Sequence, residues 1–174
     1  TPSHRIVQYA ASFAGMALTS GPTIWGTSQF NQQLFKYSAG GVLQQTYSNL
    51  PDESGIAVAP NGHLWLLSDR FSQAMDFDPK TATGIAYSLP SCGCFRLIGN
   101  PKFGPDGALY FTEGASNFVS NYPPSVGRIT ATGVFTEYPV YEPRSQPSGL
   151  TFDAHGTLWI TDIGANKIGF LGAR

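Results

Sequence analysis

Hydrophobic and polar positions alternate over short segments along the chain, and turns rich in Gly, Pro, Asn and Ser separate them. The clearest series is Gly149–Asp153, Leu158–Asp162 and Lys167–Leu171, in which Leu, Ile, Thr, Phe or Trp recur. Alternation of this kind predicts half-buried strands, whereas an amphipathic helix would repeat every 3.6 residues. None of the segments shows the helical period, so the pattern predicts an all-β chain.

A fixed spacing of ten residues joins a small residue to an aromatic residue at four places: Gly15–Trp25, Gly55–Trp65, Asn100–Tyr110 and Gly149–Trp159. Successive aromatic residues of this set are 40, 45 and 49 residues apart. Four strands fit between them, and repeats of this length are typical of β-propeller blades. We therefore expect one β-propeller domain over residues 1–174, with four-stranded blades at about 11–50, 51–90, 94–140 and 144–174.

The last repeat stops after three strands, whereas an additional strand-like segment, Arg5–Ala10, precedes the first repeat. We expect this segment to supply the missing strand, because an unpaired sheet edge exposes backbone hydrogen-bonding groups. Two assemblies stay open. One chain could close a four-bladed ring, which the large inner-strand residues Phe103 and Phe152 would help to fill. Alternatively, a homodimer could form eight blades, with Arg5–Ala10 completing the last blade of the partner.

The composition excludes some partners. Charged residues make up 12% of the chain and the net charge is -1, so a phosphate-binding surface for nucleic acid is not expected. No apolar run reaches the roughly 18–20 residues of a membrane helix. Low charge, many uncharged polar residues and a first residue other than Met predict a secreted or periplasmic protein. Cys92 and Cys94 could form a strained disulfide or stay as two free thiols.

Long, varied loops are expected on one face of the propeller, and tight turns, with His63 and His155 in or beside them, on the other. Long loops on a rigid scaffold commonly carry binding sites. The long-loop face is therefore expected to bind a small molecule, a glycan or a protein. The candidate binding residues on that face are Asp69, Arg70, Arg96, Glu113, Tyr122, Arg144 and Asp162.

Polar residues follow each aromatic residue of the repeat by three positions: Ser28, Ser68, Glu113 and Asp162. Carboxylates gathered at the mouth of a propeller channel could hold Mg²⁺ or Ca²⁺ through their oxygens. In that interpretation Glu113 and Asp162 would be metal-binding or catalytic groups. Alternatively, each of the four residues caps its own hairpin.

Three segments resemble the repeats of the virginiamycin B lyase family and related NHL-like propellers: GPDGALYFTE (104–113), GRITATGVFTEYPV (127–140) and residues 147–171. Members of that family usually have more blades than this chain encodes. The resemblance implies a catalytic histidine in a Pro-His-Gly sequence at the start of an inner strand. It also implies an acid after the second strand of the same blade, with Mg²⁺ nearby.

This chain has Pro147-Ser148-Gly149 at the matching position, and Asp162 matches the acid. The corresponding starts in other repeats, Ser54-Gly55 and Gly99-Asn100, also lack histidine. A serine hydroxyl does not titrate near neutral pH, so it cannot replace imidazole in general acid–base elimination. The sequence therefore favours a binding or scaffold module. The alternative is a Mg²⁺-dependent lyase or lactone hydrolase of the same family.

Overall fold

The computed structural model describes residues 15–19, 21–28, 31–51, 54–90, 96–115 and 123–171, with the side chains of residues 96, 97 and 115 left aside. All regular structure in these ranges is β, and no helix there could cross a membrane.

The strands form four sheets. The first sheet holds β1 (Gly15–Leu18), β2 (Thr23–Ser28), β3 (Gln33–Ser38) and β4 (Leu43–Ser48). The second holds β5 (Gly55–Val58), β6 (Leu64–Ser68), β7 (Gln73–Asp78) and β8 (Thr83–Ser88). The third holds β9 (Arg96–Phe103), β10 (Leu109–Ala115), β11 (Ser125–Ile129) and β12 (Phe135–Pro139). The fourth holds β13 (Pro147–Phe152), β14 (Leu158–Asp162) and β15 (Lys167–Leu171).

Every sheet is an antiparallel meander in sequence order, which confirms the all-β prediction. In the second, third and fourth sheets the turn between the first two strands depends on a glycine three residues before the aromatic residue of the repeat. Gly62, Gly107 and Gly156 have φ values of 85°, 74° and 80°, which side chains disfavour. Each donates its N–H to the carbonyl three residues earlier, at 2.9, 3.0 and 3.1 Å. This local turn chemistry explains the regular spacing seen in the sequence.

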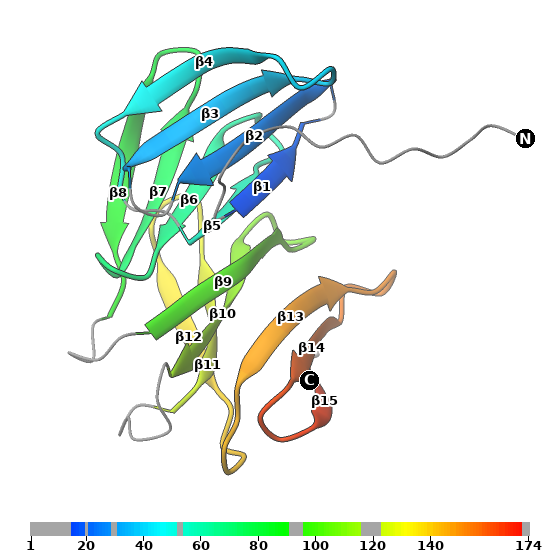
Figure 1. Ribbon diagram of the computed structural model, residues 1–174. Helices are drawn as coiled ribbons and strands as arrows, with labels where there is room; N and C mark the ends of the chain where they lie inside the picture. Colours follow the sequence, from blue (N-terminus) through cyan, green and yellow to red (C-terminus); the bar gives the residue numbers. More distant parts are fainter. Residues whose placement is uncertain are drawn as a thin grey trace, which may run out of the picture.

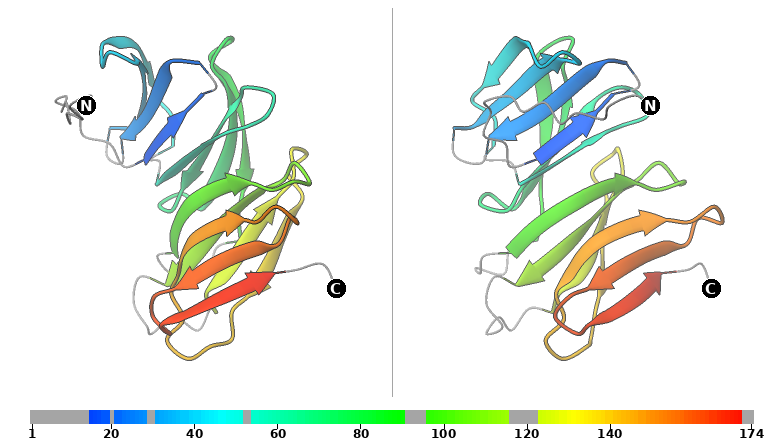
Figure 2. Two further views of the ribbon diagram at one scale, coloured as in Figure 1. Left: turned by 90° about the vertical axis from the view of Figure 1, so that its right-hand side faces the viewer. Right: turned by 45° about the vertical axis from the view of Figure 1, so that its right-hand side comes forward.

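The four sheets stand as propeller blades in an open arc (Figure 1). Contacts between successive sheets run from β1 to β5, from β5 to β9 and from β9 to β13. The first and last sheets lie at opposite ends of the arc in the other views as well (Figure 2). Arg5–Ala10 lies outside the described residues, so its predicted pairing with the last sheet stays a prediction.

Apolar side chains fill the junctions between sheets. The largest buried cluster joins the second and third sheets through Trp65, Leu67, Leu109 and Phe111, among others. The Phe111 ring lies directly over Gly127 on the neighbouring strand, where any Cβ would overlap it. Glycine at position 127 is therefore required by close packing.

Phe103 and Phe152 also belong to the junctions between sheets. The Phe103 ring meets Trp65 of the preceding sheet edge-on at 6.4 Å, and the Phe152 ring meets Tyr110 at 5.1 Å. Each of these rings therefore joins two neighbouring blades. That they help to fill a small closed ring stays a prediction.

We expect Phe111→Ala to lower the free energy of unfolding by about 3–5 kcal/mol, because a fully buried ring leaves a cavity. Urea denaturation followed by tryptophan fluorescence measures the change. Val134→Ala is the matched control, since that side chain is 59% exposed, and it should cost no more than about 0.5 kcal/mol. Equal effects of the two substitutions would contradict this packing.

Candidate functional site

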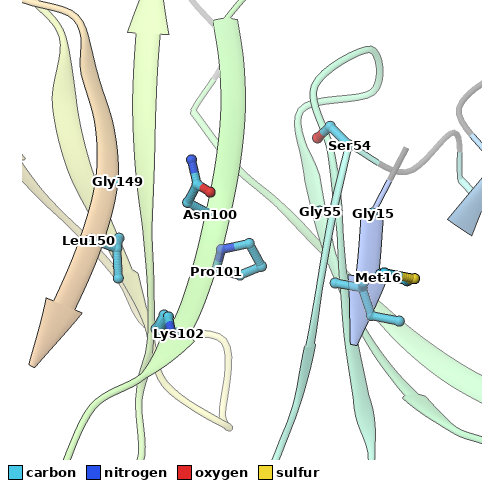
Figure 3. Close-up of a pocket in the computed structure, with 10 residues that line it drawn as sticks. Gly15, Met16, Ser54, Gly55, Asn100, Pro101, Lys102, Gly149 and Leu150 are labelled. Atoms are coloured by element: carbon cyan, nitrogen blue, oxygen red, sulfur yellow. The ribbon is translucent and has the colours of Figure 1, made fainter. Parts of the chain in front are cut away.

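The inner strands of all four sheets line one cavity of about 280 Å³ (Figure 3). The cavity lies beside the start of β5, the middle of β13 and the last residues of β9. Its lining includes Gly15 and Met16 of β1, Ser54 before β5, Asn100 and Lys102 of β9, and Gly149 of β13. Most of these groups are backbone, small or polar, and Lys102 is an exposed cation.

Small residues on this wall let successive inner strands approach closely. A Cβ on Gly15 would lie 3.3 Å from Cγ2 of Ile56 on the next inner strand. A Cβ on Gly55 would lie only 2.9 Å from Cδ of Pro101. These glycines stand ten residues before the tryptophans of their repeats, so the same spacing that indicates the blades also marks the cavity wall.

The third sheet has Asn100 at this position, and its side chain joins two blades. Asn100 adopts a left-handed conformation, with φ 50°, and its Nδ2 donates to the carbonyl oxygen of Ser148 at 2.6 Å. The Thr112 hydroxyl donates to the same oxygen at 3.1 Å. Ser148, at the position of the histidine in the family motif, is thus held by its main chain at the junction between blades.

Three of the four polar residues at the ends of second strands cap their own hairpins. The Ser28 hydroxyl accepts the N–H of Asn31, and the Ser68 hydroxyl accepts the N–H of Phe71, both at 3.2 Å. In the fourth sheet the Asp162 Oδ1 atom accepts an N–H from the residue three positions later, at 3.1 Å. These hydrogen bonds are those of the hairpin-capping interpretation.

Asp162 also ties the preceding loop to the sheet. Its Oδ2 accepts the Ser145 hydroxyl at 2.6 Å, and its Oδ1 accepts the Gln146 N–H at 2.7 Å. Burial by itself would raise the pKa of the carboxyl. The hydrogen bonds from Ser145 and Gln146, and those from the Ala165 and Gly164 N–H groups, lower the pKa by more than burial raises it. The net result is a pKa below the ordinary 3.8, because every one of these donors stabilises the ionised form.

Glu113 is 1% exposed and accepts a hydrogen bond from the Ser125 hydroxyl at 2.7 Å. The same hydroxyl lies 3.5 Å from Oε1 of Glu137. Across the described ranges, no three His, Cys, Asp or Glu side chains come together in a way that could hold a metal ion. With both Asp162 oxygens already engaged by protein donors, the described residues do not fit the Mg²⁺ or Ca²⁺ site considered from the sequence.

The remaining predicted residues are spread over separate loops. Asp69 Oδ1 accepts the Arg70 N–H at 2.7 Å, and the Arg70 guanidinium lies over the ring of Phe71 at 5.6 Å. Arg144 is exposed in the connection before β13. The side chain of Arg96 and all of Tyr122, Cys92 and Cys94 lie outside the described residues.

The described members of the predicted set do not line the cavity. Sequence reasoning missed Ser54, Asn100 and Lys102, which do. The signal that could have found them is the small residue ten positions before each aromatic residue, because its neighbours share the same inner strand. Attention to charged residues led away from this wall, where most groups are uncharged.

Comparison with known proteins identifies a family and several structures of similar fold. The model described as the virginiamycin B lyase family matches residues 2–174. A streptogramin B lyase structure is 25% identical with a TM-score of 0.75, covering 96% of this chain and 53% of that chain. A virginiamycin B lyase from Staphylococcus aureus is 27% identical with a TM-score of 0.72, covering 91% and 52%.

A third structure is a catalytically inactive histidine-to-alanine variant of virginiamycin B lyase from Staphylococcus aureus with Quinupristin. It is 22% identical with a TM-score of 0.54, and the match covers 91% of this chain and 66% of that chain. A search of the curated proteins returned no match. The chain therefore spans about half the length of the first two lyases it resembles.

We expect Asp162→Asn to lower the free energy of unfolding at pH 7 by about 1–3 kcal/mol, because buried donors lose a charged acceptor. The folded pKa lies below 3.8, so the ionised group stabilises the fold above that value. Its contribution is lost as the pH falls through the folded pKa, and the difference from wild type should shrink below about pH 4. Urea denaturation over a pH series measures both effects.

Asp69→Asn is the control for this substitution, since Asp69 lies in the matching hairpin of the second sheet and is only half-buried. It should change the stability by no more than about 0.5 kcal/mol. A pH-independent difference between wild type and Asp162→Asn would contradict the capping role.

Proposed function

The chain belongs to the virginiamycin B lyase family, and from this premise we propose that it is a binding module rather than a lyase. Its ligand is a small molecule, or one projecting group of a larger glycan or protein, held in the cavity between the inner strands. A volume of about 280 Å³ lies just below the range of about 300–1,000 Å³ for ligand pockets.

The observation that carries this proposal is the serine at position 148. Elimination in this family would need a group that takes a proton near neutral pH, and a serine hydroxyl does not. Ser148 itself is held through its main chain, since its carbonyl oxygen accepts hydrogen bonds from Asn100 and Thr112 of the neighbouring blade. Among the described residues that line the cavity there is no histidine, so we expect a ligand to bind there without proton abstraction.

Asp162, the acid that matches the family motif, stabilises the local structure. Asp162 anchors its own hairpin and the loop that contains Ser145 and Gln146. A bound divalent cation would supply Lewis-acid chemistry, but Asp162 would have to give up these hydrogen bonds to coordinate it. Because the described residues do not fit the metal, no catalytic step is assigned to it.

One relative suggests the first ligand to try. The Staphylococcus aureus virginiamycin B lyase variant with a histidine replaced by alanine is described as catalytically inactive and as being with Quinupristin. Loss of a histidine is therefore compatible with a complex of that protein and Quinupristin. A chain that has serine at the motif position could in the same way bind a related compound without converting it.

We also place the protein outside the cytoplasm, as a secreted or periplasmic module. This part of the proposal is supported by its low proportion of charged residues, 12%. Fractionation of the source cells tests it, and recovery of the protein in the cytosol alone would overturn it.

We expect Quinupristin, used as the probe, to give a saturable heat in titration calorimetry and to be recovered intact after incubation with Mg²⁺. Lys102→Trp should weaken binding at least about tenfold, or about 1.4 kcal/mol, because it places bulk at the cavity wall. Lys80→Trp is the matched control, since Lys80 is an exposed lysine in the turn between β7 and β8. It should leave binding unchanged.

A ligand that binds the native state raises the melting temperature by mass action. Since the described residues do not fit a metal site, we expect Mg²⁺, Mn²⁺ and Ca²⁺ to leave the melting temperature unchanged. A metal-dependent rise that Glu113→Gln and Asp162→Asn together abolish, accompanied by turnover of a streptogramin or lactone, would replace this proposal with the lyase alternative. Absence of binding to any compound in a streptogramin and lactone panel would remove the small-molecule ligand from the proposal.

A further inference from the structure

The two sheets at the ends of the arc (Figure 1) each carry exposed apolar side chains. On the first sheet Met16 and Leu18 are 66% and 71% exposed. On the last sheet Ile168 and Phe170 are 72% and 70% exposed, and Trp159 beside them is 39% exposed. Apolar side chains grouped in this way commonly mark an interaction surface. We call these two groups the first-sheet face and the last-sheet face.

The internal junctions of the arc show what each face is shaped to meet. An apolar residue of one inner strand rests on a glycine of the preceding sheet: Ile56 on Gly15, and Pro101 on Gly55. Met16 occupies the same register position as Ile56, one residue after the glycine of its own repeat. Met16 is therefore at the position from which an inner-strand side chain packs on the preceding sheet.

A second contact repeats in the same way. The aromatic residue of the second strand meets the inner strand of the next sheet, as Trp65 meets Phe103 at 6.4 Å and Tyr110 meets Phe152 at 5.1 Å. The residue in the last sheet that corresponds to Trp65 is Trp159, and it is 39% exposed where Trp65 is 2% exposed. The last-sheet face is thus one half of a junction.

The other half of that junction is on the first-sheet face. Leu18 pairs with Ile24 in its sheet as Phe103 pairs with Leu109 and Phe152 with Leu158. Leu18 is therefore the residue that would meet the second-strand aromatic residue of a preceding sheet. The two end faces of one chain are complementary in kind and lie at opposite ends of its arc (Figure 2).

We propose that two copies of this chain join head to tail, so that the first-sheet face of each packs on the last-sheet face of the other. Met16 then rests on the partner's Gly149, and Leu18 meets the partner's Trp159. The dimer closes because the same heterologous contact forms twice about a two-fold axis. One streptogramin B lyase has about the length of two such chains, since this chain covers 53% of it.

Chain order indicates which sheet the N-terminal segment, which lies outside the described residues, would join in the dimer. Each later inner strand follows the outermost strand of the preceding sheet: β4 precedes β5, β8 precedes β9 and β12 precedes β13. By this order we expect Arg5–Ala10, which precedes β1, to pair with the sheet before the first one. In the dimer that sheet is the partner's last sheet, which has three strands among the described residues where the others have four.

The tyrosine of this segment fits the same place. The hydroxyl of Tyr47 in β4 donates to the Pro79 carbonyl, and that of Tyr87 in β8 donates to the Ala131 carbonyl. Both carbonyls lie in the turn between the last two strands of the following sheet. Tyr9 stands fifth in RIVQYA, as Tyr47 does in LQQTYS and Tyr87 in TGIAYS. Arg5–Ala10 is thus expected to pair with the partner's β15.

Light scattering coupled to size exclusion tests the dimer. The full chain should give twice the monomer mass of 18.7 kDa, and Leu18→Asp or Phe170→Asp should each give a monomer. Both residues are at least 70% exposed, so neither substitution should disturb the fold of one chain. Ile85→Asp is the matched control, because Ile85 is 62% exposed on β8 of the second sheet, and it should stay dimeric.

Mixing the two variants distinguishes a head-to-tail contact from like-with-like pairing. Leu18→Asp and Phe170→Asp together retain one intact junction, so native mass spectrometry should detect a heterodimer although each variant alone is monomeric. A variant that still dimerises alone would overturn the head-to-tail arrangement. Larger, open-ended species of the wild type would overturn the closed dimer.

A wild-type chain that is monomeric at every concentration would overturn the proposal and leave the faces to another occupant, such as further blades of a longer polypeptide. Removal of residues 1–10 tests the strand exchange separately. It should raise the dissociation constant of the dimer at least tenfold without changing the circular dichroism spectrum of the monomer. An unchanged dissociation constant would overturn the placement of Arg5–Ala10.

Discussion

The close approach of successive inner strands is the contact on which the rest of the structure depends. It is possible because glycine stands where the neighbouring side chain must pass, as Gly15 faces Ile56 and Gly55 faces Pro101. With the strands this close, the aromatic residues of each blade reach the next blade and cover the core between them. The cavity wall combines glycine backbone, apolar side chains such as Met16 and Leu150, and a few polar groups, which suits a ligand pocket.

The same packing decides what the polar residues of the blades can do. The ends of the second strands are buried, and a buried polar group is costly unless it is hydrogen-bonded. Ser28, Ser68 and Asp162 meet this requirement by capping their hairpins. A carboxylate used in this way is a poor metal ligand, because coordination would release the loop that it holds. The chain therefore has the scaffold of its family, with serine at the position of the motif histidine.

Because the same contact between sheets repeats along the chain, the proposed pairing of two chains is connected with ligand binding in the cavity. Each sheet carries one surface for the sheet before it and another for the sheet after it, so an open arc ends in two complementary faces. Because β1 and β13 both line the cavity, a partner seated on the end faces would lie next to the ligand. Pairing of two chains would then turn an open groove into an enclosed channel, and the two proposals would reinforce each other.

The sequence by itself determined the blades. The strands alternate over a few residues, and the turns need glycine with positive φ at positions such as Gly62 and Gly156, so both signals are local. Only the tertiary structure decided that Phe103 and Phe152 join neighbouring sheets, that Asn100 and Lys102 line the cavity, and that Asp162 is engaged on both oxygens. Those outcomes depend on how one sheet is rotated and packed against the next. Residues far apart in the chain set that arrangement, and the period of a strand does not encode it.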